Sequence, residues 1–205
     1  CGSFGDLSIF SFYANKIITT GEGGMIVTDD PEIAEKCRYY RNLCFGKKRF
    51  IHDDFGFNYP FTNTQAALGL AQLERLEELV KIKRNIGHTY NQLFKDNPYL
   101  QLPIDKNEFA NNIYWVYPLV LKENFPHDAE YVMTELQKNG IGTRPFFYPL
   151  HLQPILQKMN FIKADLNYPN SRFLYNRGFY IPSGMPLTIE EMRYIAHTIN
   201  RIVSL

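Results

Sequence analysis

The chain has 205 residues, of which 45% are hydrophobic and 15% aromatic, and its formal net charge at neutral pH is +1. This supply of apolar side chains is enough for a buried core, and the length suits one large domain or two small ones. The near-neutral charge argues against nucleic acid or an acidic membrane surface as the main partner, because both favour clustered Lys and Arg. The densest basic run, Gly46-Lys47-Lys48-Arg49, is short and precedes acidic residues, so we interpret it as a solvated loop.

The cysteines, Cys1, Cys37 and Cys44, are odd in number and form no Cys-x-x-Cys pair. This pattern is typical of reduced thiols in a cytosolic protein rather than of a disulfide framework. There is no signal peptide and no apolar run long enough to cross a bilayer. The sequence therefore predicts a soluble, cytoplasmic, globular protein.

In chain order, the first predicted elements are two strands, over residues 7–12 and 25–28. The connection between them carries Lys16 and several glycines, which mark turns with unusual backbone angles. Asp30-Pro31-Glu32 then predicts the start of a helix, with an acid as the N-cap and proline at the first helical position. Because the chain runs from Cys1 almost directly into a strand, we expect a further segment upstream.

Residues 45–61 are expected to form a loop, and Thr62 to Gln65 match a capping box that opens a long helical stretch. This stretch is expected either to continue or to kink towards Phe94. The remainder predicts a smaller α/β unit, so the whole chain is expected to be α/β or α+β. Pro118 should place its strand at a sheet edge or a bulge, because proline has no N–H. The elements expected in that unit are strands over 113–121, 141–147 and 178–181 and helices over 127–139 (closed by Gly140), near 170–177 and from the capping box at 188–191 onwards.

The most informative stretch runs from Ser11 to Lys16 and on to the glycines at 21–24. A hydroxyl at a strand end, five residues before a lysine, can act on the same anionic cofactor as the amine. The amine can condense with an aldehyde while the hydroxyl holds a phosphate, and lysine becomes a neutral nucleophile when it is desolvated. Spacing alone leaves a second interpretation open, in which Lys16 is a surface residue of a hairpin loop. The glycines lack the spacing and the following helix of a dinucleotide fingerprint.

The string SFYANKIITTGEGGMIVTDD at residues 11–30 resembles the cofactor-lysine segment of the DegT/DnrJ/EryC1/StrS family of pyridoxal-phosphate (PLP) dependent sugar aminotransferases. The similarity continues through FGFNYPFTNTQAALGLAQLE at 55–74 and IGTRPFFYPLHLQP at 141–154. The resemblance implies a fold-type-I PLP-dependent transferase. Residues 1–78 would be the C-terminal part of the large PLP-binding domain, and residues 79–205 the small C-terminal α/β domain.

The same resemblance implies roles for single residues. Lys16 would form the Schiff base with PLP and then move the proton between cofactor and substrate carbons. Ser11 would donate a hydrogen bond to the PLP phosphate, and Asn58 would reach the phosphate of the neighbouring subunit, so we expect a homodimer with shared active sites. The alternative for Asn58 is an ordinary turn residue. The aspartate that pairs with the pyridine nitrogen, the ring-stacking aromatic and the phosphate-cradling loop are all expected before Cys1, since Asp6 is too near Lys16 to replace that aspartate.

The implied reaction is transamination of a nucleotide-linked 4-keto-6-deoxyhexose to a 4-amino-4,6-dideoxyhexose of the perosamine or viosamine type, with L-glutamate as amino donor. The first and third similar segments are nearest in wording to that branch of the family. His151 is a candidate to contact the sugar or the nucleotide diphosphate, and Arg144 to pair with a phosphate, although each could be a packed loop residue. Many relatives have Arg-Met where this chain has Pro60-Phe61, so the local loop shape is expected to differ.

Two other functions are weighed against this one. A PLP-dependent sugar dehydratase of the same family would be expected to carry histidine at the position of Lys16. A non-catalytic remnant that serves as a binding or regulatory module is favoured by the expected truncation of the chain before Cys1. No histidine shows metal-ligand spacing, so a metal site is not expected. The sequence does not distinguish GDP, UDP and dTDP as the nucleotide, nor an axial from an equatorial amine.

Overall fold

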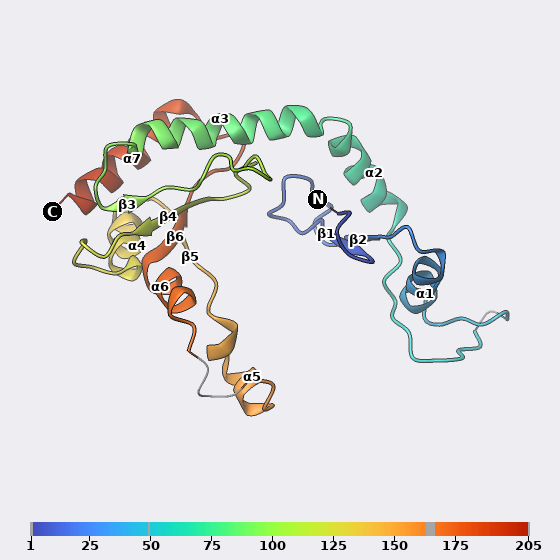
Figure 1. Ribbon diagram of the computed structural model, residues 1–205. Helices are drawn as coiled ribbons and strands as arrows, with labels where there is room; N and C mark the ends of the chain where they lie inside the picture. Colours follow the sequence, from blue (N-terminus) through green and yellow to red (C-terminus); the bar gives the residue numbers. More distant parts are fainter. Residues whose placement is uncertain (1, 49, 163–166, 205) are drawn as a thin grey trace. The chain divides into compact units, whose positions relative to one another are not determined.

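The computed structural model describes residues 2–48, 50–162 and 167–204 (Figure 1). The chain divides into two units, Cys1–Leu79 and Val80–Leu205. Both units contain helices and short strands, so the predicted mixed α/β architecture is confirmed. Within the described ranges, no helix combines the length and the apolarity needed to cross a bilayer. Cys37 and Cys44 are free thiols, and the prediction for Cys1 lies outside the described residues.

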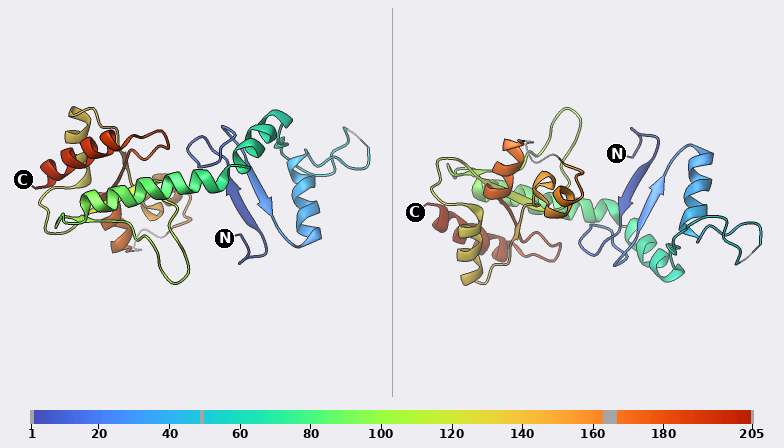
Figure 2. Two further views of the ribbon diagram at one scale, coloured as in Figure 1. Left: turned by 90° about the horizontal axis from the view of Figure 1, so that it is seen from above. Right: turned by 90° about the horizontal axis from the view of Figure 1, so that it is seen from below.

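The first unit is built on a two-stranded hairpin of β1 (Ser8–Ser11) and β2 (Gly24–Val27), which pair antiparallel. Helix α1 (Pro31–Arg41) follows the hairpin, and α2 (Asn63–Leu73) follows the long loop after it. Helix α3 (Leu76–Phe94) starts shortly after α2 ends and continues into the second unit (Figure 2). The long helical stretch expected from the capping box towards Phe94 is therefore divided into two helices, α2 and α3.

Local sequence signals determine where these helices begin. The carboxylate of Asp30 accepts hydrogen bonds from the backbone amides of Glu32 and Ile33, at 2.8 and 3.2 Å. Thr62 and Gln65 form the expected capping box: each side chain accepts from the backbone amide of the other residue. Each pair satisfies amides that a helix N-terminus otherwise leaves without a partner.

The second unit contains a four-stranded antiparallel sheet with the strand order β3-β4-β6-β5. Its strands are β3 (Leu100–Gln101), β4 (Tyr117–Leu121), β5 (Arg144–Pro145) and β6 (Gly178–Ile181). The strand expected over 178–181 is confirmed. The strands expected over 113–121 and 141–147 are shorter than predicted, and β3 was not predicted.

Pro118 does not mark an edge strand, because β4 lies between β3 and β6 in the sheet. The reason it is tolerated is local. β6 pairs along most of β4, with Tyr180 opposite Pro118, whereas β3 pairs only with Val120 and Leu121. The side of β4 that faces β3 is therefore unpaired at Pro118, where a missing N–H removes no ladder hydrogen bond.

The helices of the second unit are α4 (Ala129–Lys138), α5 (Pro154–Lys158), α6 (Pro169–Arg177) and α7 (Ile189–Val203), with a short 3₁₀ helix, η1 (Leu150–Leu152). Of these, η1 and α5 were not predicted. Gly140 closes α4 as expected, at φ +74°. The amides of Gly140 and Ile141 donate to the carbonyls of Gln137 and Leu136, which is a Schellman motif.

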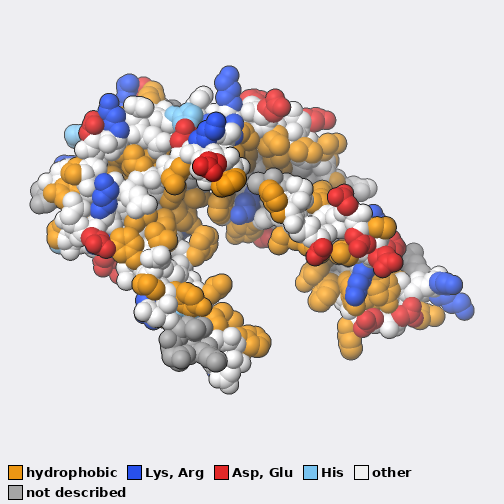
Figure 3. Space-filling model, viewed as in Figure 1, with side chains coloured by type: hydrophobic (Ala, Val, Ile, Leu, Met, Phe, Trp, Pro, Cys, Tyr) orange, Lys and Arg blue, Asp and Glu red, His pale blue; other side chains and the backbone are white. Residues whose placement is uncertain are grey.

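The main core lies in the second unit. Side chains of β4 and β6 meet those of α3, α4 and α7 in one cluster, which includes Tyr90, Tyr117, Leu119, Leu136, Phe179 and Ile199. Among the described residues of the first unit, by contrast, the buried hydrophobic side chains are Cys44 and Leu79. Figure 3 accordingly shows many hydrophobic side chains on the surface of the first unit.

Candidate active site

Lys16 lies on the loop that joins β1 to β2, and this loop is closed at its neck. The backbone of Phe12 continues the hairpin ladder by donating to the carbonyl of Gly23 at 2.9 Å. The carbonyl of Phe12 then accepts from the amide of Thr20 at 3.0 Å and from the hydroxyl of Thr19 at 2.9 Å. Inside the loop, the Lys16 amide donates to the carbonyl of Tyr13 at 3.0 Å, which forms a turn. The neck thus fixes both ends of the short segment that carries Lys16.

The neck also requires glycine. Gly21 and Gly23 have φ of +78° and +125°, a region in which other residues are strained. A Cβ at Gly23 would lie 2.3 Å from the Phe61 ring. That ring also packs on Phe12, with 6.1 Å between the ring centroids. Phe61 is one of the two residues at which we expected a different local loop shape, and its ring lies against Phe12 and Gly23 of the neck.

Helix α2 supports the neck from the other side. The Gln72 side chain accepts from the Thr19 amide at 3.1 Å and donates to the Thr19 carbonyl at 2.6 Å. One turn earlier, Gly69 leaves room for Thr20, whose methyl would lie 3.1 Å from an added Cβ. Two turns earlier, Gln65 donates to the carbonyl of Glu22 at 3.3 Å. A single face of α2 therefore holds the residues that follow Lys16.

Sequence reasoning missed these supporting residues. The signal that could have found them is the spacing of Gln65, Gly69 and Gln72, at i, i+4 and i+7 of the predicted helix. Such a spacing puts two amide side chains and a small residue on one helix face. A face of this kind suits hydrogen bonding to a backbone segment better than it suits an apolar core.

Ser11 ends β1, and Lys16 lies five residues later in the loop that follows. Ser11 is the last residue of β1 and is exposed, and its Oγ accepts from the Tyr13 amide at 3.3 Å. The Ser11 hydroxyl proton has no acceptor among the described residues, so it can be donated to a ligand. Lys16 is half-buried. The structure thus places an amine and a hydroxyl donor on one connection.

Asn58 lies on the separate segment between α1 and α2. Its backbone pairs with Asn42 in an isolated bridge, and its side chain is exposed. The rings of the flanking Phe57 and Tyr59 stack on each other, with 5.2 Å between centroids. Asn58 therefore lies on a different segment of the first unit from Ser11 and Lys16.

His151 and Arg144 lie in the second unit, in η1 and in β5. His151, in η1, is 7% exposed, and its ring lies 4.9 Å from that of Tyr168. The His151 Nε2 atom is buried and has no hydrogen-bond partner among the residues that the structure describes. Arg144 is exposed in β5 and lines a pocket of about 400 Å³ with Thr143 and residues of α4. A buried nitrogen without a partner is uncommon, and it suits a group that receives a ligand.

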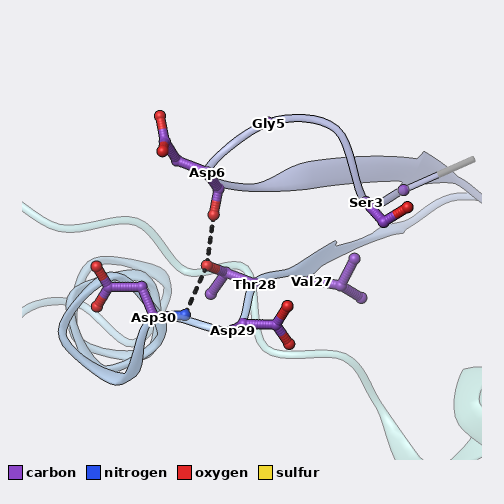
Figure 4. A pocket seen from close by; sticks show the side chains of 8 residues that line it. Ser3, Gly5, Asp6, Val27, Thr28, Asp29 and Asp30 are labelled. Carbon is purple, nitrogen blue, oxygen red and sulfur yellow. Dashed lines mark hydrogen bonds between the residues drawn. The ribbon is translucent and has the colours of Figure 1, made fainter.

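A second pocket, of about 310 Å³, lies beside the start of β1 (Figure 4). Asp6, Asp29 and Asp30 line it together with small residues. The Thr28 hydroxyl donates to the Asp6 carbonyl at 2.6 Å and accepts from the Asp30 amide at 3.1 Å. Asp6 precedes β1 in the chain, whereas Lys16 follows β1. Within the described ranges, no group of three or more His, Cys, Asp or Glu side chains could hold a metal ion.

The groups around Lys16 can be tested against the demands of PLP. This cofactor needs an amine for its aldehyde and hydrogen-bond donors for its phosphate. Lys16 supplies the amine, and Ser11 supplies a hydroxyl whose proton has no acceptor among the described residues. The hydrogen-bonded neck limits how far these two residues can move apart. The donor set on the β1–β2 connection therefore fits PLP.

Comparison with known proteins agrees with this chemistry. Residues 1–200 match the model of the DegT/DnrJ/EryC1/StrS aminotransferase family. A GDP-perosamine synthase of Vibrio cholerae is 37% identical over 199 residues, which make up 97% of this chain and 53% of that protein. A Helicobacter pylori protein named UDP-4-amino-4,6-dideoxy-N-acetyl-beta-L-altrosamine transaminase is 32% identical over 203 residues, 97% of this chain and 52% of that protein. The chain thus spans about half the length of these curated relatives.

Comparison of the fold with solved structures agrees with the sequence comparison. Helicobacter pylori PseC, described as an aminotransferase involved in the biosynthesis of pseudoaminic acid, has a TM-score of 0.90 and 28% sequence identity. That match covers 99% of this chain and 54% of that chain. The architecture is therefore part of a fold-type-I transferase, and PLP is the cofactor of the family. The family suggested by three separate motifs is confirmed: the chain belongs to the DegT/DnrJ/EryC1/StrS aminotransferase family.

Proposed function

We propose that this chain carries the cofactor lysine, Lys16, of a PLP-dependent aminotransferase acting on a nucleotide-linked 4-keto-6-deoxyhexose. The product would be a 4-amino-4,6-dideoxyhexose of the perosamine or viosamine type, with L-glutamate as amino donor. The observation that carries the proposal is the placement of Lys16 and Ser11 on one connection whose neck is locked on both sides. The similarity to a GDP-perosamine synthase makes a GDP-linked sugar the first substrate to test.

The roles proposed for the residues follow from their chemistry. When bound, PLP supplies an electron sink for the carbon that exchanges its proton. The Lys16 amine holds the cofactor and moves the proton at the substrate carbon, which requires a neutral amine. Ser11 donates its hydroxyl proton to a phosphate oxygen. Asn58, which is exposed and is flanked in sequence by two rings that stack on each other, contributes its amide to the site of a neighbouring subunit in a homodimer.

The second unit is proposed to contribute substrate contacts. His151 offers a buried Nε2 that has no partner in the described part of the chain and can bond to a hydroxyl or diphosphate oxygen of the nucleotide sugar. Arg144 is exposed and can pair with a phosphate. In this proposal residues 1–78 belong to the large PLP-binding domain and residues 79–205 form the small domain, close to the observed division after Leu79.

The test uses Lys16→Ala in the natively expressed protein, with Lys36→Ala as control, because Lys36 is exposed on α1. Borohydride reduction should fix PLP to the parent protein and to the control. Peptide mass analysis should then place the cofactor on Lys16, and Lys16→Ala should lose both the label and the visible absorbance of lysine-bound PLP. A label on another lysine, or unchanged turnover in Lys16→Ala, contradicts the proposal.

The substrate is tested separately. GDP-, UDP- and dTDP-linked 4-keto-6-deoxyhexoses are each incubated with L-glutamate and the PLP-loaded protein, and the product is identified by mass. Amination of one sugar supports the proposal and identifies the nucleotide. Loss of water from the sugar without amination would instead support a dehydratase. Labelling of Lys16 without turnover of any sugar would support a binding or regulatory module.

A further inference from the structure

Gln72 makes an unusual contact with the loop that carries Lys16. Both ends of its side-chain amide bond to the backbone of one residue, Thr19, 53 positions earlier in the chain. The oxygen accepts from the Thr19 amide at 3.1 Å, and the nitrogen donates to the Thr19 carbonyl at 2.6 Å. A side-chain amide bonded in this way replaces the backbone partner that a strand neighbour would supply.

The position of Thr19 gives this contact its importance. Thr19 lies three residues after Lys16, and its hydroxyl donates to the carbonyl of Phe12 at 2.9 Å. The amide of the next residue, Thr20, donates to the same carbonyl at 3.0 Å. Thr19 is therefore part of the neck that closes the loop of Lys16, and Gln72 is the side chain that ties this neck to α2.

The rest of the α2 face reinforces the contact. Thr20 is buried, and its methyl packs at Gly69, where an added Cβ would lie 3.1 Å away. Gln65 donates to the carbonyl of Glu22 at 3.3 Å. Gln72 itself is held in place because its nitrogen also donates to the carbonyl of Leu68, at 2.8 Å within α2. The amide is thus oriented by its own helix before it meets the loop.

We propose that Gln72 is a positioning residue, which acts through the Thr19 backbone to fix Lys16 where its amine meets the cofactor aldehyde. The inference rests on the proposed function, in which Lys16 holds PLP. Reactions between two groups depend steeply on their relative placement, so a loop that is free at its neck holds the amine less well. Loss of Gln72 should therefore change how Lys16 holds PLP more than it changes the fold.

The test compares Gln72→Leu and Gln72→Glu with the parent in the natively expressed, PLP-loaded protein. The leucine removes both hydrogen bonds, whereas the glutamate keeps the acceptor for the Thr19 amide and loses the donor. Gln92→Leu is the matched control, since Gln92 is exposed on α3. The readouts are the PLP dissociation constant, the pH midpoint of the visible band of lysine-bound PLP, and hydrogen exchange of residues 12–23.

We expect Gln72→Leu to weaken PLP binding on the order of tenfold, as the loss of two backbone hydrogen bonds would. It should also shift the pH midpoint and speed exchange at residues 12–23, with Gln72→Glu intermediate and Gln92→Leu unchanged. Parent-like exchange, PLP affinity and pH midpoint in Gln72→Leu would overturn the inference. A uniform loss of protection with an unchanged midpoint in both Gln72 variants would also overturn it, because it indicates a purely structural role.

The two proposals fail in different ways. If Lys16 is not the cofactor lysine, borohydride labelling of the parent protein misses Lys16. If only the positioning role is wrong, the label remains on Lys16 in the parent while the Gln72 variants keep its properties. Should Gln72→Leu fail to fold, Gln72→Glu still decides the question, since it retains the polar side chain and removes one of the two bonds to Thr19.

Discussion

Lys83 is a buried amine in the second unit. It is 4% exposed, on α3, and its Nζ donates to the carbonyl of Ser183 and lies 3.4 Å from the Ser183 hydroxyl. Within the described part of the chain, no carboxylate forms an ion pair with it. Burial lowers the pKa of Lys83 from 10.5 to about 8, because the charged form loses its hydration.

This pKa shift predicts a pH dependence of stability. Between about pH 8 and 10.5 the unfolded chain still holds the Lys83 proton that the folded chain has released. The free energy of unfolding should therefore rise with pH across that window. Urea unfolding at several pH values checks this, with Lys83→Met as the comparison. Equal slopes against pH in the parent and in Lys83→Met would contradict the assignment.

The packing of helix α3 against the segment before β4 depends on Gly87. A Cβ at Gly87 would lie 2.3 Å from the ring of Tyr114, which is 1% exposed. The Tyr114 hydroxyl donates to Asp105 and accepts from Asn91, at 3.0 Å each, so the ring is held in place. Tyr114 itself has a φ of +50°, which is uncommon for a residue with a side chain.

Gly87→Ala is therefore expected to destabilise the second unit by about 1–3 kcal/mol through overpacking, although alanine is the better helix former. Gly142→Ala is the matched control, since nothing lies within 4 Å of an added Cβ there. Thermal or urea unfolding measures both changes. A Gly87→Ala variant as stable as Gly142→Ala would show that the Tyr114 ring can move aside.

The two units differ in how much apolar surface they bury. In the second unit, buried side chains from three strands and three helices form one cluster. In the first unit, the described strands and the helices α1 and α2 contain no buried residue. A two-stranded hairpin without a core is marginally stable. The first unit should therefore open far more readily than the second unit.

Hydrogen exchange of the 205-residue chain alone, without PLP, tests this difference. Amides of β4 and β6 should be strongly protected, whereas those of β1 and β2 should exchange quickly, because little apolar surface resists their opening. The same measurement on the natively expressed protein serves as the control. Equal protection of the two pairs of strands in the chain alone would contradict the expectation.

The sequence alone determined the features that depend on neighbouring residues. Helix starts at Asp30, Thr62 and Thr188 follow from capping side chains within three positions, and Gly140 ends α4 because it accepts a positive φ. Three motifs in the right order were sufficient to identify the family. The role of Lys16 stays a prediction, which rests on its spacing from Ser11 and on the family resemblance.

The tertiary structure decided what depends on residues far apart in the chain. Strands β3 and β5 have two residues each, and pairing with β4 and β6 defines them. Pro118 lies inside a sheet because β3 ends before reaching it. The spacing of Gln65, Gly69 and Gln72 marks a polar helix face, but only the folded chain shows that Gln72 bonds to Thr19, 53 positions away. Local hydrogen bonds can be read from short spacings, whereas long-range pairing emerges only when the chain is folded.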